Sequence, residues 1–207
     1  DRREGEGALV LVNGDSITGM WKNGNCNRGK IFYSNGDKFE GAWVNWKPYG
    51  EGEMTYHNES PYKRFTGTWS NGAPDSGKME YKNPGDLSHV EYYEGTWKGY
   101  MWHGKGTVRW RKDPKDQHRR EYTGYFENDS ISGSGILTYS NRNYLVGWFK
   151  GNNAHGDCTY HYVDHDVSFT TEWKNGEFEG RVNGMRFGRE RKISYTQWKE
   201  GLGRFFD

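Results

Sequence analysis

Apolar and polar side chains alternate along residues 39–56, and one short turn interrupts the alternation. Phe39, Gly41 and Trp43 alternate with a different set of neighbours, which is the period-two pattern of a β-strand with two distinct faces. The alternation resumes at Gly50 after the turn. The stretch therefore predicts one β-hairpin with an aromatic and glycine face. Because such a short hairpin is not stable alone in water, we expect it to stack on copies of itself.

The same pattern recurs along the chain at fixed offsets. The first strand of each unit carries an aromatic anchor, and these anchors are Trp21, Trp43, Trp69, Trp97, Phe126, Phe149 and Trp173, with Trp198 as a less regular member. The residue two positions before the anchor is glycine in the first six units and becomes Thr171 before Trp173. The second strand carries its own glycine at Gly29, Gly52, Gly77, Gly106 and Gly135. We interpret these glycines as the positions that leave room beneath a ring, and expect the anchor rings to face glycine on adjacent strands.

Turn signals separate the predicted strands. Asn-Gly pairs favour type I′ hairpin turns, and they occur at 13–14, 23–24, 35–36, 71–72, 175–176 and 183–184. The sequence thus predicts an all-β fold, an elongated single-layer antiparallel β-solenoid of stacked hairpins with about fourteen to sixteen strands. We expect one array over 1–207, with a partial leading repeat at 1–14, seven repeats at 15–182 and a degenerate C-terminal repeat or cap at 183–207. Because 1–14 match only the second half of a unit, we expect further repeats before them.

These repeats resemble the MORN (membrane occupation and recognition nexus) family. The family consensus runs approximately Tyr-x-Gly-x-Trp-x-x-Gly-x-x-x-Gly-x-Gly, and residues 93–99 (YEGTWKG) followed by 104–106 (GKG) are similar to it. The resemblance covers almost the whole chain. It implies a twisted antiparallel sheet with a curved groove, and association with membranes. The family resemblance also implies relatives among enzymes, which include lipid kinases and a methyltransferase.

Composition and charge narrow the function classes. Apolar residues make up 32% of the chain and the mean hydropathy is −1.15, values that favour disorder. The aromatic fraction of 17% favours instead a thin folded sheet held by large rings. The net charge of +1 excludes a global field that would attract nucleic acid. Single-stranded nucleic acid would also need basic residues along the aromatic face, and the basic residues lie elsewhere.

Motifs of catalysis and of cofactor binding are absent from the sequence. No glycine-rich phosphate loop, GxSxG or HExxH occurs, so we expect neither an enzyme nor a cofactor. One cluster has metal-ligand residue types, but its two histidines would share a strand face while its cysteine points away, so we expect no metal site; its members are Cys158, His161, Asp164, His165 and Asp166.

The two cysteines bear on the cellular compartment. Cys26 and Cys158 would lie about 48 Å apart in a stack of hairpins, beyond the reach of a disulfide. Two unpaired thiols favour a reducing compartment, so we expect a cytoplasmic protein.

Three long connections and an aromatic groove form the predicted protein-binding surface. The connections span 58–65, 83–93 and 112–122 and leave the same edge of the sheet. A peptide or helix would lie in the groove, and arginines of the loops would bind its acidic groups at the edge. The predicted contact residues are Trp43, Trp69, Trp97, Phe126, Arg119 and Arg120. The alternative is that the connections are tolerated insertions and the rings only hold the sheet together.

A basic cluster near the C-terminus offers a second predicted surface. Anionic phospholipid attracts basic residues close to a membrane, and the residues concerned are Arg181, Arg186, Arg189, Arg191 and Lys192. The alternative is an ordinary solvated surface.

The sequence therefore predicts a non-catalytic scaffold or protein-interaction module, with attachment to a membrane or the cytoskeleton as a further possibility. One alternative is the regulatory or targeting region of an enzyme, a lipid kinase or methyltransferase, whose catalytic domain lies outside this chain. A second is a carbohydrate-binding module with sugars stacked on the tryptophan-lined face. Assembly into a homo-oligomer is compatible with each of them.

Overall fold

Nearly all of the regular structure is antiparallel β-sheet. The computed structural model describes residues 2–82, 89–111 and 119–187, and the chain divides into two compact units, Asp1–Arg111 and Lys112–Asp207. Among the described residues the only helix is a single 3₁₀ turn at Val163–His165. The predicted all-β fold of stacked antiparallel hairpins is confirmed in each unit.

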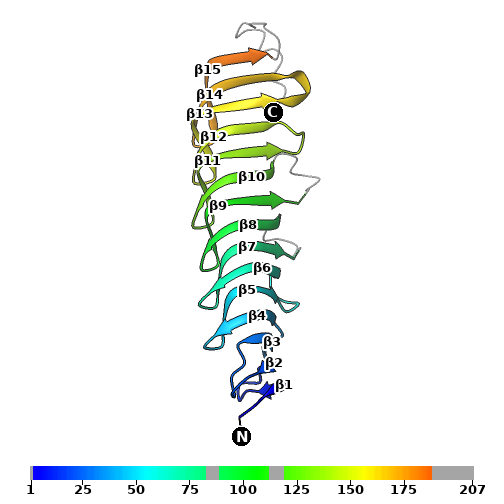
Figure 1. Cartoon of the computed structure of the whole chain (residues 1–207). Helices are drawn as coiled ribbons and strands as arrows, with labels where there is room; N and C mark the ends of the chain where they lie inside the picture. The colour runs from blue at the N-terminus through cyan, green and yellow to red at the C-terminus, as the bar shows by residue number, and fades with distance from the viewer. Residues whose placement is uncertain (1, 83–88, 112–118, 188–207) are drawn as a thin grey trace. The chain divides into compact units, whose positions relative to one another are not determined.

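Unit 1 contains nine strands that follow one another in chain order, each pairing antiparallel with its chain neighbours (Figure 1). They are β1 (Gly5–Val10), β2 (Ser16–Trp21), β3 (Arg28–Phe32), β4 (Lys38–Val44), β5 (Lys47–Thr55), β6 (Tyr62–Ser70), β7 (Ala73–Tyr81), β8 (Val90–Lys98) and β9 (Met101–Trp110).

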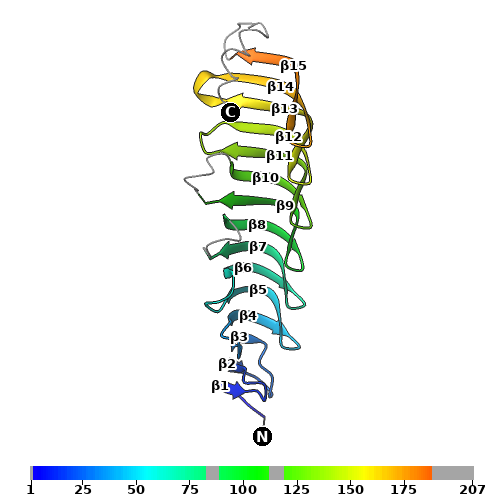
Figure 2. The ribbon, with the colours of Figure 1, turned by 180° about the vertical axis from the view of Figure 1, so that it is seen from behind.

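Unit 2 repeats this arrangement with six strands (Figure 2). They are β10 (Arg119–Glu127), β11 (Ser130–Tyr139), β12 (Tyr144–Lys150), β13 (Asn153–Tyr162), β14 (Val167–Lys174) and β15 (Glu177–Phe187). The expected boundary between residues 182 and 183 falls inside β15. Gly184 pairs with Thr170 of β14, so the turn predicted at 183–184 is wrong and these residues are part of a strand.

Three of the predicted Asn-Gly turns have the backbone that type I′ requires, with left-handed φ at both central residues. The φ values are 52° and 81° at Asn23–Gly24, 51° and 87° at Asn71–Gly72, and 53° and 87° at Asn175–Gly176.

Two other Asn-Gly turns differ from the prediction. At 13–14 and 35–36 only the glycine is left-handed, with φ of 88° at Gly14 and 93° at Gly36. The Leu11 N–H donates to the Asp15 carbonyl and the Gly14 N–H donates to the Leu11 carbonyl, which closes a three-residue loop ending in a left-handed glycine. The longer loop explains why the asparagine keeps an ordinary φ.

Glycines pair directly with glycines across successive strands, and we call this row the glycine ladder. In unit 1 it runs from β1 to β9 as Gly7, Gly19, Gly29, Gly41, Gly52, Gly67, Gly77, Gly95 and Gly106. In unit 2 it runs through Gly124, Gly135 and Gly147. Beyond Gly147 the buried Cys158 takes the place that a further glycine would have.

Aromatic rings cover the ladder. A Cβ added to Gly41 would lie 2.7 Å from Cζ of Phe39, and one added to Gly52 would lie 2.5 Å from the same atom. Phe39 therefore covers a glycine on its own strand and the glycine paired with it. Tyr93 and Tyr122 occupy the same position in later repeats. At Phe39, Tyr93 and Tyr122 the ring above the glycines is thus the one two residues before the first-strand glycine, which corrects the expectation that it is the anchor two residues after. Gly7 differs, because the ring nearest to it belongs to the anchor Trp21.

The anchor tryptophans bridge neighbouring repeats instead. The Trp69 indole N–H donates to the Gly52 carbonyl at 3.2 Å, and the Trp97 N–H donates to the Gly77 carbonyl at 3.1 Å. Trp69 also packs edge-on against Phe39 and Phe65, with ring centroids 5.5 and 4.9 Å away. Trp69 and Trp97 therefore each tie their repeat to the preceding one by a hydrogen bond and by ring contacts.

The first glycine of each Gly-x-Gly pair has a different task from the second. In the β4–β5 hairpin Gly41 pairs with Gly52 while Trp43 pairs with Pro48, so β5 holds extra residues that form a bulge. Gly50 lies in this bulge with φ of 69°, and its missing Cβ would meet nothing within 4 Å. The same left-handed position recurs at Gly104, Gly133 and Gly156. This glycine is needed for its φ, whereas the ladder glycine is needed for space.

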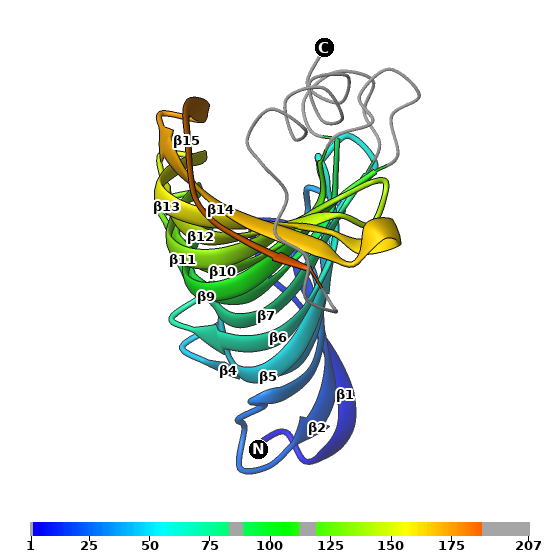
Figure 3. The ribbon, with the colours of Figure 1, turned by 90° about the horizontal axis from the view of Figure 1, so that it is seen from above.

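Each unit has two different edges. Within unit 1 the turn edge holds the short hairpin connections, such as that from β4 to β5, and the loop edge holds the others, such as those from β5 to β6 and from β7 to β8. The strands are strongly curved (Figure 3). Tyr100, from the β8–β9 turn, stacks on Tyr62 at the start of β6 with centroids 6.1 Å apart. A residue of the turn edge thus reaches the loop edge across the inner face of unit 1.

Replacing Gly95 by valine should destabilise unit 1. The added side chain would lie 2.6 Å from the Tyr93 hydroxyl and 2.6 Å from Gly106 Cα, and overpacking of this kind costs about 1–3 kcal/mol. Thermal or urea melts of the variant and the parent measure the change. Glu94→Val, one residue away on the exposed outer face, is the control and should stay within about 0.5 kcal/mol of the parent. Equal midpoints for Gly95→Val and the parent would show that the ladder tolerates a branched side chain.

Gly50 and Gly52 should respond differently to the same substitutions. Gly50→Ala should cost about 1–2 kcal/mol because alanine is strained at left-handed φ, and Gly50→Asn should cost less because asparagine adopts this φ more readily. Gly52→Ala and Gly52→Asn should both destabilise, since any Cβ meets the Phe39 ring. Urea melts of the four variants make the comparison. If asparagine is as harmful as alanine at 50, the bulge does not depend on φ.

Candidate functional site

The tryptophans predicted to line an open groove are core residues. Trp43, Trp69 and Trp97 are 3%, 2% and 7% exposed, and Phe126 is 3% exposed. Their rings fill the inner face because the strands curve around it and successive rings pack edge-to-face. This corrects the expectation of an open aromatic groove: these four rings offer little surface to a partner in this conformation.

A hollow of about 520 Å³ lies at the loop edge of unit 1, and we call it the loop-edge hollow. Its walls come from β6, β7, β8 and the residues that follow β7 and β9. The lining residues are Lys63, Lys78, Glu80, Tyr81, Lys82, Glu91, Tyr92 and Arg111. Four of the eight side chains are basic and two are acidic, so the hollow has a positive balance.

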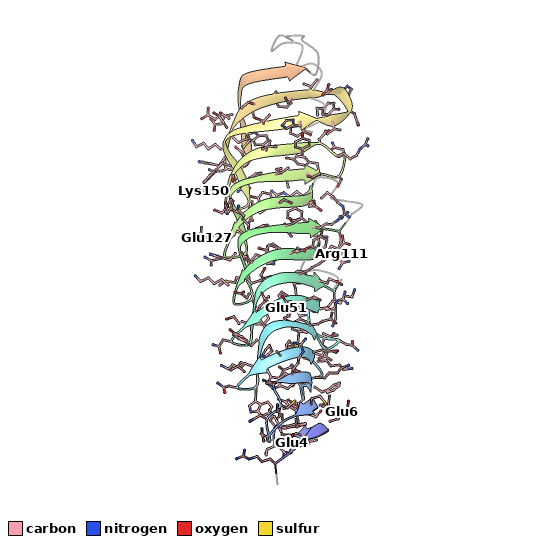
Figure 4. The ribbon with its side chains drawn as sticks, viewed as in Figure 1. Glu4, Glu6, Glu51, Arg111, Glu127 and Lys150 are labelled. Carbon is pink, nitrogen blue, oxygen red and sulfur yellow. The ribbon has the colours of Figure 1, made fainter. Side chains whose placement is uncertain are left out.

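The hollow lies where the three long connections of the sequence analysis join the sheet. Lys63 belongs to the end of the first connection, Lys82 precedes the second, and Arg111 precedes the third. Figure 4 shows Arg111 at the edge of unit 1 where β9 ends. The predicted rim and the hollow therefore coincide at their bases, although 83–88 and 112–118 lie outside the described residues.

One acidic side chain of the hollow makes two ion pairs. The Glu80 carboxylate accepts from the Arg64 guanidinium at 2.7 Å and from the Lys63 ammonium at 2.9 Å. Hydrogen bonds from Arg64 and then Lys63 hold the pKa of Glu80 below its usual range, against the opposing effect of burial. Glu80 therefore stays ionised, and its carboxylate is the partner of the Lys63 ammonium.

The other three cations contact rings and carbonyls. Lys78 Nζ lies 3.9 Å from the centroid of the Tyr92 ring, a cation–π contact. Lys82 donates to the backbone carbonyl of His57, and Arg111 donates to that of Tyr81 at 2.6 Å. These contacts fix the positions of the cations without cancelling their charge. An anionic group entering the hollow would meet three preplaced positive charges beside two tyrosine rings.

The predicted loop arginines belong to unit 2. Arg119 begins β10 and donates to the Asn152 carbonyl in the β12–β13 turn at 3.2 Å, so it helps to hold that turn. Arg120 follows it on β10 and is half-buried. The Arg119 side chain and residue Arg120 both interact within the fold. Their predicted role as a clamp for a partner stays a prediction.

The predicted lipid-binding cluster lies at the limit of the described chain. Arg181 and Arg186 are on β15, where the backbone is described but these side chains are not. Arg189, Arg191 and Lys192 lie outside the described residues. The lipid hypothesis therefore stays a prediction from sequence.

The residues with metal-ligand types have separate surroundings. His161 stacks on Tyr144 with centroids 4.3 Å apart, and burial lowers its pKa. Asp164 pairs with Arg142 at 3.0 Å. Cys158 is buried, while His165 and Asp166 belong to the connection between β13 and β14. In the part of the chain that the structure describes, no three such side chains are grouped to hold a metal.

Sequence analysis missed the lysines of the loop-edge hollow. Lys63, Lys78 and Lys82 are separated along the chain and come together only because β6 and β7 pair. A signal existed: strand alternation places Lys78 on the face opposite the buried Met79. The curvature that makes a hollow there could not be read from the alternation.

Comparisons with known proteins bear on the repeat type. None of the curated proteins matches the chain. No helix among the described residues has the length and apolar character that crossing a membrane requires. The family model described as MORN repeat matches residues 18–38, 93–113 and 122–144. The matched ranges cover the β2–β3 hairpin, most of β8 and β9, and the β10–β11 hairpin. These three matches identify the chain as a protein that carries MORN repeats.

Proposed function

We propose that the chain is a non-catalytic protein-interaction module that binds an acidic segment of a partner protein at the loop-edge hollow. The observation that carries the proposal is the set of three cations, Lys78, Lys82 and Arg111, that contact rings and carbonyls rather than carboxylates. MORN repeats support the coarser statement that this is an interaction module.

A peptide fits the chemistry of the hollow better than a single small anion. Its volume of about 520 Å³ can hold several side chains. Tyr81 and Tyr92 supply apolar area beside the charges, and tyrosine and arginine are enriched at protein interfaces. Glu80 and Glu91 also line the hollow and would repel a flat anionic surface. The expected partner is therefore a segment with spaced carboxylates and an apolar residue between them.

The proposed setting of this module is the cytoplasm. Both cysteines are free and buried, which fits a reducing compartment. Attachment to a membrane or the cytoskeleton would come from the partner or from the C-terminal basic cluster. An enzyme domain elsewhere in a longer protein is compatible with the proposal, since this region would then target it.

Neutralising two lysines of the hollow should weaken binding of an acidic peptide. We expect the double variant Lys78→Gln and Lys82→Gln to bind a fluorescent peptide of alternating glutamate and leucine about tenfold more weakly than the parent. The parent's affinity should also fall with added salt. Fluorescence anisotropy measures both effects. The control, Lys38→Gln with Lys98→Gln, has the same net charge and removes one similar cation–π contact, that of Lys38 with Phe32.

Two results would contradict the proposal. One is equal peptide affinity for the parent and both double variants, when melting curves show that all are folded. The other is a lysine-dependent association with vesicles containing phosphatidylinositol phosphate while the peptide fails to bind, which would assign the hollow to lipid.

A further inference from the structure

One turn of unit 1 has an unusual residue at its tip. Asn45 and Trp46 connect β4 to β5 with φ of 49° and 62°. Of the other hairpin turns with two positive φ values, three have glycine at the second position, at Gly24, Gly72 and Gly176, and two have Asp129 or Asn152 there. Bulky side chains rarely adopt left-handed φ. Trp46 therefore occupies a strained position, and strain of this kind is often retained at functional sites.

The Trp46 side chain lies partly in solvent. It is 47% exposed, whereas the anchor Trp43 three residues earlier is 3% exposed. No ring contact involving Trp46 occurs among the described residues. Its indole is therefore not needed to pack the core, and glycine would serve the turn better. The tryptophan is best explained by something that its ring contacts outside the chain.

A second hollow, of about 430 Å³, lies beside this tryptophan at the turn edge, and we call it the turn-edge hollow. It lies between the β2–β3 and β4–β5 turns. Its lining residues are Gly24, Asn25, Cys26, Asn27, Trp43, Val44, Asn45 and Trp46. The Trp43 indole N–H donates to the Cys26 carbonyl at 2.7 Å, and the Trp43 backbone N–H donates to the Asn27 carbonyl at 2.9 Å. These bonds fix the two turns relative to each other.

Three asparagines line this hollow, and their side-chain amide groups are available. The backbones of Asn25 and Asn27 take part in hydrogen bonds. Within the described residues, the side-chain amides of Asn25, Asn27 and Asn45 make no hydrogen bond to protein. Each amide offers both donors and an acceptor. The hollow thus presents a set of neutral hydrogen-bonding groups next to an exposed aromatic face.

The absence of charge in the lining restricts the ligand class. None of the eight lining residues is acidic or basic, so a phosphate, a carboxylate or a cation would enter without a charged partner. Neutral amides that both donate and accept match adjacent hydroxyl groups. The indole face matches a flat C–H surface of a ring. Both features occur together in a pyranose sugar.

We propose that the turn-edge hollow binds a neutral saccharide, with one pyranose ring stacked on Trp46 and its hydroxyls bonded to the amides of Asn25, Asn27 and Asn45. This site is distinct from the loop-edge hollow and does not depend on the function proposed for it. It also differs from the sugar-binding face expected from sequence, because the anchor rings of that face are buried.

Nuclear magnetic resonance can test the site with defined probes. The probes are glucose, galactose, mannose and N-acetylglucosamine and their β-linked oligomers, added at millimolar concentration to the ¹⁵N-labelled chain. We expect at least one of them to shift the Trp46 indole N–H signal in a saturable manner. Glucose 6-phosphate and a proline-rich peptide are the comparison probes and should leave the signal in place.

Variants separate binding from folding. Trp46→Gly should abolish the saccharide-dependent shifts of the asparagine amide signals while raising the melting midpoint, because glycine relieves the left-handed strain. Asn27→Ala should weaken binding severalfold without changing the fold. Trp148→Ala is the control, since Trp148 is 57% exposed in unit 2 and should retain full binding.

Three results would overturn the proposal. The first is that no neutral saccharide moves the Trp46 signal. The second is that the proline-rich peptide or the sugar phosphate moves it while the saccharides do not. The third is that Trp46→Gly lowers the melting midpoint, which would make the ring a structural element of the turn.

Discussion

The close approach of backbone and ring along the glycine ladder is the constraint on which the repeat depends. Because Gly41 and Gly52 face each other, the Phe39 ring can lie flat across both strands. Because the Phe39 ring lies close to the backbone, the Trp69 indole of the next repeat can donate to the Gly52 carbonyl and pack edge-on against the Phe39 ring. The backbone and ring of one repeat thus form the surface against which the anchor tryptophan of the next repeat packs. A chain with few aliphatic residues obtains a core in this way, because aromatic rings packed flat on glycine backbone exclude water from a thin layer between them.

The same packing moves binding chemistry away from the sheet face and toward its edges. Strands that curve around their rings leave the inner face filled, as the contact between Tyr100 and Tyr62 shows in unit 1. The turns and connections do not contribute ladder glycines, so their sequences are free to vary. The loop-edge hollow and the turn-edge hollow of unit 1 lie at such edges. One is lined by lysines and tyrosines at the loop edge and the other by asparagines and tryptophan at the turn edge.

Local patterns predicted the local structure well, and failures began where several repeats act together. Period-two alternation and Asn-Gly pairs located the hairpins, because both depend on a few neighbouring residues. The exposure of Trp43 could not be read in this way, since its burial depends on strand curvature and on rings from neighbouring repeats. The sequence also could not show that Arg119, at the start of β10, contacts Asn152 in the turn between β12 and β13. The lysines of the loop-edge hollow share no local motif, so only strand pairing reveals their grouping.

Departures from a repeat are informative when the repeat's physical rule is known. Cys158 replaces a ladder glycine, and its small side chain is buried where a larger one would not fit; this change is compatible with the core. Trp46 departs in the opposite sense, because a bulky residue stands where left-handed φ favours glycine and its ring does not enter the core. The first substitution preserves packing, while the second opposes the local backbone and gains no packing in return. A bulky residue at a backbone position that disfavours it, with no packing gained in return, points to a contact outside the fold, and this argument directs attention to Trp46 ahead of the other exposed rings.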